Sequence, residues 1–232
     1  RIVCQGGYLV VDMKERKIVE DFRYPDFKDW MATAVVDLPE GGFLCSVNPR
    51  GADSGKAIHF YEFGADHKLK RIVRLPGYFN SRSLERRPDG ELVVTHEHGF
   101  VRVRIADGAA AEVVKNYPQP AGRNLFAVVP DRAGTGYWAG TGYGADLVHY
   151  AVDGRVLSVW KAEQGGKQNV FYAQPAERED GDVYLCNWTG HGENDSFNGW
   201  QVIEFGKDGQ VKWHLDSPDR YGSISGIDVL ED

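Results

Sequence analysis

A short apolar segment recurs five times along the 232-residue chain, and this repeat constrains the fold more than any other feature. The copies occupy residues 2–5, 43–46, 92–95, 137–140 and 184–187. The third residue of each copy is Cys4, Cys45, Val94, Ala139 or Cys186. Successive copies lie 41 to 49 residues apart, and 50 residues separate the last from the first through the termini. This period is typical of the four-stranded blades of a β-propeller.

Each copy lies in the same succession of four short strands. The segments that follow the copies, such as 57–63 and 100–105, alternate in polarity, which favours a strand with two different faces. Turns with Asp-Gly follow, for example at 107–108 and 153–154, because glycine accepts the positive φ of a tight hairpin. We therefore predict an all-β fold, a single domain over residues 1–232, formed as a five-bladed β-propeller with four antiparallel strands per blade.

The two ends of the chain are incomplete in complementary ways. Residues 1–25 begin with the second strand of a blade and lack a first strand, whereas residues 223–230 have the pattern of a first strand without a blade after it. We predict that this C-terminal strand completes the N-terminal blade. Such pairing closes the ring and removes exposed sheet edges.

The composition agrees with this fold and argues against two kinds of partner. The chain has 28 Gly, 11 Tyr and 11 Phe but 2 Met, which favours short strands and turns over helices. Its net charge of −7 argues against nucleic acid, because phosphate binding needs a concentrated positive field. No run of about 20 apolar residues predicts a membrane span. The three cysteines occupy equivalent positions on different blades, so we expect packed thiols without disulfides.

The loops between second and third strands are expected on one face, around the channel mouth, and they carry the candidate binding residues. The longest and most polar of these loops covers residues 187–195 and contains Asn187, Trp188 and His191. Tyr143 and Arg50 lie in equivalent loops. The residues that precede the first strands are all polar: Thr33, Arg82, Asn124, Asn169 and Ser225. This ring either binds water or contacts the hydroxyls and carboxylate of a ligand.

Two kinds of chemistry are open at these loops. His96 and His98 are two residues apart and could chelate a metal with His191 as third ligand, although exposed loop histidines are common; metal and cofactor dependence stay unknown. Trp188 and Tyr143 offer flat faces for a sugar ring, beside Arg82 and Arg50 for an anionic group, and packing between blades is the alternative. No Gly-x-Ser-x-Gly motif supports a serine nucleophile.

The segments 186–192, 200–205, 211–213 and 223–230 together resemble the closing blades of uncharacterised bacterial β-propeller proteins of the Bacteroidetes type. Members of that group are longer, with six or more blades. The resemblance implies that the Asn-Trp-x-Gly-His-Gly loop, with Asn187, Trp188 and His191, lies at the channel mouth. It also implies a secreted or periplasmic protein, whereas unpaired cysteines are equally compatible with the cytoplasm.

The leading functional hypothesis is a small-molecule site for a carbohydrate or other polar metabolite at the channel mouth. Arg82, Asn124 and Asn169 are its expected hydrogen-bond donors, and Trp188 is its stacking surface. If the protein is an enzyme, lyase or hydrolase chemistry with His191 or His98 as general base is expected, because imidazole titrates near neutral pH. The alternative is a non-catalytic propeller that presents the same face to a protein partner.

Overall fold

The computed structural model describes residues 2–4, 7–12, 14–24, 31–108, 110–120, 123–162, 171–188, 199–217 and 224–229. These residues form strands β1 to β19 and one short 3-10 helix, η2 (Gly51–Asp53). No helix in the described ranges has the length and apolarity needed to cross a bilayer. The chain divides into two compact units, which are residues 1–97 with 101–116, and residues 98–100 with 117–232.

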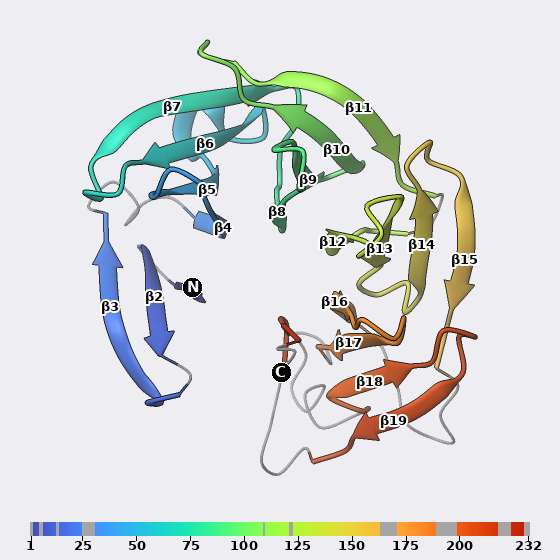
Figure 1. Cartoon of the computed structure of the whole chain (residues 1–232). Helices are drawn as coiled ribbons and strands as arrows, with labels where there is room; N and C mark the ends of the chain where they lie inside the picture. The colour runs from blue at the N-terminus through green and yellow to red at the C-terminus, as the bar shows by residue number, and fades with distance from the viewer. Residues whose placement is uncertain are drawn as a thin grey trace. The chain divides into compact units, whose positions relative to one another are not determined.

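Three of the sheets run along the N-terminal half of the sequence (Figure 1). One has the order β1 (Ile2–Cys4), β2 (Gly7–Asp12), β3 (Lys17–Arg23). Another has the order β4 (Met31–Asp37), β5 (Phe43–Asn48), β6 (Ala57–Phe63), β7 (Leu69–Pro76). The third has the order β8 (Leu84–Arg86), β9 (Leu92–His96), β10 (Gly99–Arg104), β11 (Glu112–Pro118).

The other two sheets lie in the second unit. One has the order β12 (Ala127–Pro130), β13 (Gly136–Gly140), β14 (Leu147–Ala151), β15 (Val156–Trp160). The last has the order β16 (Tyr172–Glu177), β17 (Val183–Asn187), β18 (Val202–Phe205), β19 (Val211–Leu215). Consecutive strands pair antiparallel in both sheets.

The sheets confirm the all-β class and the repeat. Each recurring apolar segment forms the predicted second strand, namely β1, β5, β9, β13 and β17. Four of the described sheets have four strands, and the sheet that begins with β1 has three. The described C-terminal residues 224–229 carry no strand assignment, so the completion of the first sheet by this segment stays a prediction.

Burial within a sheet explains why the second strand is the apolar repeat. Every residue of β9 and β13 is buried, and so is nearly all of β5. The fourth strand is the sheet edge in each case, and β15 is mostly exposed. A strand covered on both faces is mainly apolar, and the buried polar side chains Ser46 and Thr95 make hydrogen bonds, whereas an edge strand tolerates exposed polar side chains.

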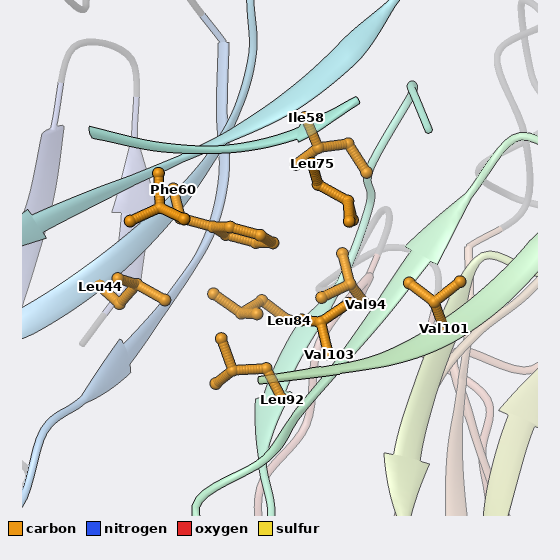
Figure 2. Close-up of a cluster of buried hydrophobic side chains, with 10 residues drawn as sticks. Leu44, Ile58, Phe60, Leu75, Leu84, Leu92, Val94, Val101 and Val103 are labelled. Carbon is orange, nitrogen blue, oxygen red and sulfur yellow. The ribbon is translucent and has the colours of Figure 1, made fainter. Parts of the chain in front are cut away.

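Apolar side chains from neighbouring sheets interdigitate to form the core of each unit. In the first unit, Leu44 of β5 and Phe60 of β6 meet Leu84, Leu92 and Val103 from the sheet of β8 to β11 (Figure 2). The second unit has an equivalent cluster between its two sheets, which contains Trp138, Leu147, Tyr172, Leu185 and Phe205.

The cysteines follow the same pattern of burial. Cys45 and Cys186 are buried cysteines outside any disulfide, which agrees with the prediction of packed thiols for these two residues. Burial raises the pKa of the Cys186 thiol to about 12, so it stays protonated at neutral pH. The side chain of Cys4 lies outside the described residues.

Candidate functional site

Four aromatic side chains from the loops of the second unit form what we name the aromatic cluster: Phe126, Tyr143, Phe171 and Trp188. Phe171 is its centre. The Phe171 ring centroid lies 4.8 Å from that of Tyr143, 4.9 Å from that of Phe126 and 5.3 Å from that of Trp188. All three contacts are edge-to-face, with interplanar angles of 90°, 78° and 68° respectively, the favoured arrangement for aromatic pairs.

The cluster has a buried base and an exposed outer part. Phe171 is 6% exposed and packs with Ala173 and Cys186, whereas Tyr143 is 58% exposed. Trp188 is half-buried. The Tyr143 ring is therefore held on a fixed apolar base while much of its surface remains accessible.

Gly142 brings the Tyr143 loop against the cluster. Its backbone N–H donates to the Tyr172 carbonyl over 2.8 Å, and its carbonyl accepts from the Tyr172 N–H over 3.0 Å. Its φ of 55° lies in the left-handed region. A Cβ here would lie 3.3 Å from the Phe171 ring and 3.4 Å from the Asn124 carbonyl oxygen, so glycine allows this close approach.

Asn187 connects two loops of the same sheet through hydrogen bonds. It is fully buried; its Oδ1 accepts from the Phe171 N–H over 3.1 Å, and its Nδ2 donates to the Trp200 carbonyl over 2.8 Å. The next residue, Trp188, donates its backbone N–H to the Phe171 carbonyl over 2.8 Å. Both polar atoms of the Asn187 side chain thus bond to backbone groups, of Phe171 and Trp200, and the ligand contact predicted for Asn187 from the sequence stays a prediction.

Asn124 lies beside the cluster and is exposed. Its Oδ1 accepts from Gln119 Nε2 over 3.3 Å, and the Gln119 backbone N–H donates to the His98 carbonyl over 2.9 Å. The Asn124 amide NH₂ makes no hydrogen bond to any residue in the described ranges. The structure thus joins two predicted site residues, Asn124 and His98, through Gln119, and His98 is exposed.

Other predicted site residues belong to the first unit. His96 is 7% exposed; its Nε2 lies 3.3 Å from Asn116 Oδ1, and its ring is perpendicular to that of Tyr78 at 4.8 Å. It is therefore a packed side chain, and the role predicted for it in binding a ligand or metal stays a prediction. Arg50 is exposed and Arg82 is half-buried.

His191 and Asn169 lie outside the described residues. Within the residues that the structure does describe, no group of three or more His, Cys, Asp or Glu side chains is placed to hold a metal. The predicted three-histidine metal site contains His191 and stays a prediction.

Two features of the site were missed from the sequence. Phe126 and Phe171 each stand two residues after an asparagine of the predicted polar ring, so the shared pattern Asn-x-Phe at 124–126 and 169–171 could have indicated them. The second is a charged group in the first unit. Asp53 of η2 accepts from Arg74 Nη2 over 2.6 Å and lies 3.2 Å from His59 Nε2.

His59 of β6 is buried, and burial lowers the pKa of its imidazole, with the Arg74 charge acting in the same direction and Asp53 opposing both. This side chain is therefore mainly neutral at pH 7. The sequence offers no signal for the group, because only the pairing of β6 with β7 and the path of η2 bring its members together.

The comparisons with known proteins concern the fold. No protein-family model matches the sequence, and no curated protein sequence matches it. Among solved structures, a protein of unknown function from Bacteroides caccae is similar, with 17% identity over 97% of this chain and 96% of the other, and a TM-score of 0.60. Regucalcin, a calcium-binding protein from Agrobacterium tumefaciens, has 14% identity over 96% of this chain and 74% of its own, with a TM-score of 0.62.

Virginiamycin B lyase from Staphylococcus aureus is also similar, with 13% identity, a TM-score of 0.58 and coverage of 85% of this chain. This chain spans 59% of that lyase. The lyase and regucalcin are propeller proteins. At these identities the likeness shows the fold alone, and the chain is an all-β protein of propeller-like architecture.

Proposed function

We propose that the aromatic cluster binds a small polar molecule with an apolar face, and that a carbohydrate ring is the class it fits best. This proposal rests mainly on Tyr143, whose ring is 58% exposed and packs edge-to-face on the buried Phe171. Asn124 beside it has an amide NH₂ without a described partner and lies next to Gly142. A ring face stacks on the tyrosine, and a ring hydroxyl accepts from the asparagine.

Turnover of the bound molecule is the second part of this proposal. Two of the structural neighbours are lyases, virginiamycin B lyase and a streptogramin B lyase, which favours lyase chemistry over other reactions. His98 is the described general-base candidate, because it is exposed and connects to Asn124 through Gln119. His191 and Asn169 remain candidates for the same site by their sequence positions.

We further propose that residues 223–230 supply the first strand that the sheet of β1 to β3 lacks, which makes the chain one five-bladed propeller. The support is that β1 corresponds to the second strand of the other sheets and has no neighbour on its other side among the described residues. Deletion of residues 223–232 is then expected to lower the melting temperature markedly. An unchanged melting temperature would disprove the closure.

A thermal-shift screen against neutral sugars, other polar metabolites and divalent metals tests the binding site. A ligand present at ten times its Kd stabilises the protein by about 1.4 kcal/mol, a readily measured shift. Tyr143→Ala should abolish the shift and leave the melting temperature of the free protein almost unchanged, since the ring is mostly exposed.

Trp213→Ala is the matched control, because Trp213 is another exposed aromatic residue of the second unit, 47% exposed on β19. It should leave ligand binding intact. A shift that survives Tyr143→Ala would remove the aromatic cluster from consideration. A flat response to the whole panel would favour the alternative function, which is the binding of a protein partner.

A further inference from the structure

Arg50 and Arg82 stand apart from most arginines of this protein. Nine described arginines lie within ion-pair distance of a carboxylate: Arg23, Arg71, Arg74, Arg87, Arg102, Arg104, Arg123, Arg155 and Arg178. Arg50 and Arg82 have no such partner in the described part of the chain, although the net charge is −7.

A pair of hydrogen bonds brings the two arginines into one region of the first unit. Asn48 Oδ1 accepts from the Ser81 N–H over 2.8 Å, and Asn48 Nδ2 donates to the Ser81 carbonyl over 2.9 Å. Arg50 follows Asn48 by two residues, and Arg82 follows Ser81 directly. We name this pair of bonds the Asn48–Ser81 clasp.

The backbone around Arg82 is held on both sides. The Arg82 and Ser83 N–H groups both donate to Thr95 Oγ1, over 2.9 and 2.8 Å. On the other side, the fully buried Ser81 hydroxyl lies 3.0 Å from Thr33 Oγ1 and 3.2 Å from Ser46 Oγ. The hydroxyls and amides here hold the backbone, whereas the Arg82 guanidinium makes no hydrogen bond or ion pair to any described residue.

An arginine without a counter-charge among the described residues is available to pair with an anionic ligand. We propose that Arg82, assisted by Arg50, forms an anion subsite for the carboxylate or phosphate of a small metabolite. Arg82 presents the planar fork of donors that pairs with two oxygens of either group. Because its backbone is already held, little ordering is needed on binding. This site does not depend on the aromatic cluster of the second unit.

The test is a set of calorimetric titrations at low salt with glucuronate, glucose 6-phosphate, inorganic phosphate and uncharged glucose. Wild-type protein should bind at least one of the anions about tenfold more tightly than glucose, as expected for charged hydrogen bonds. Arg82→Gln should remove that preference, and Arg82→Lys should retain part of it. Comparing glucuronate with the two phosphates distinguishes a carboxylate ligand from a phosphate ligand.

Arg86→Gln is the matched control. Arg86 lies on β8 four residues from Arg82, is half-buried and also lacks an ion pair among the described residues. The Arg86→Gln variant should bind the anion as tightly as wild-type protein does. Equal losses in the Arg86 and Arg82 variants, or no preference for any anion in wild type, would overturn the proposal. Glucose binding that depends on Tyr143 tests the proposed function separately, so the two ideas can fail independently.

Discussion

Replacement of Asn187 by alanine removes two buried hydrogen bonds next to the aromatic cluster. The expected loss of stability follows from the groups that they satisfied. The Phe171 N–H loses its acceptor, and the Trp200 carbonyl loses its donor. Each buried backbone group left without a partner costs about 1–3 kcal/mol. For two such groups we expect a total loss of about 2–6 kcal/mol in the free energy of unfolding.

Urea denaturation followed by tryptophan fluorescence measures this loss. Five of the six tryptophans lie in residues 117–232, so the signal reports mainly on the second unit. Asn124→Ala is the control, because that side chain is exposed and its removal should cost under about 0.5 kcal/mol.

Asn187→Asp tests the two bonds separately. It keeps an acceptor for Phe171 but places a carboxylate oxygen against the Trp200 carbonyl, so we expect a loss at least as large as that of alanine. A loss below about 0.5 kcal/mol for Asn187→Ala would refute the reasoning, because the amide would then contribute nothing to the placement of Phe171.

Three further predictions concern buried groups. The hydroxyl of Tyr150 is buried without a hydrogen-bond partner in the described residues, so Tyr150→Phe should leave stability unchanged or raise it by about 1 kcal/mol; a clear loss in urea denaturation would mean that the hydroxyl has a partner. Because the pKa of His59 is below its usual 6.5 in the folded state, the unfolded chain binds protons first, and stability should fall as the pH drops below about 6.5. His59→Gln should reduce this pH dependence, and a slope equal to that of wild type would contradict the assignment. In a Cys4→Ala variant, thiol reagents should label native protein far more slowly than unfolded protein, since Cys45 and Cys186 are buried; rapid labelling of native protein would disagree.

The strands could be predicted because their signal is local and repeated. The second strands recur at a regular interval, and burial on both faces favours apolar residues, as in residues 92–94 of β9 and in β13. The turn at 153–154 was equally accessible, since Gly154 has the expected positive φ, whereas Gly108 in the other predicted turn does not. These features depend on neighbours in sequence, so one chain is enough to recognise them.

The loops that carry the candidate residues could be predicted, but the contacts of those residues could not. The loops after β13 and β17 do carry Tyr143 and Trp188, as the repeat indicated. Which side chains are free and which are engaged depends on contacts between loops: Asn187 bonds to the backbone of Phe171, and His96 packs on Tyr78. The polarity of a loop residue does not show whether its side chain binds a ligand or holds the backbone of another loop, because both roles use the same residue types.

The most direct test of the proposed site is to follow the indole N–H signals of ¹⁵N-labelled protein by NMR during titration with the best ligand of the screen. Binding at the aromatic cluster predicts that the Trp188 signal moves with saturation, while those of Trp138 and Trp213, which lie outside the cluster, stay in place. A movement confined to other indoles, with that of Trp188 unchanged, would contradict the account.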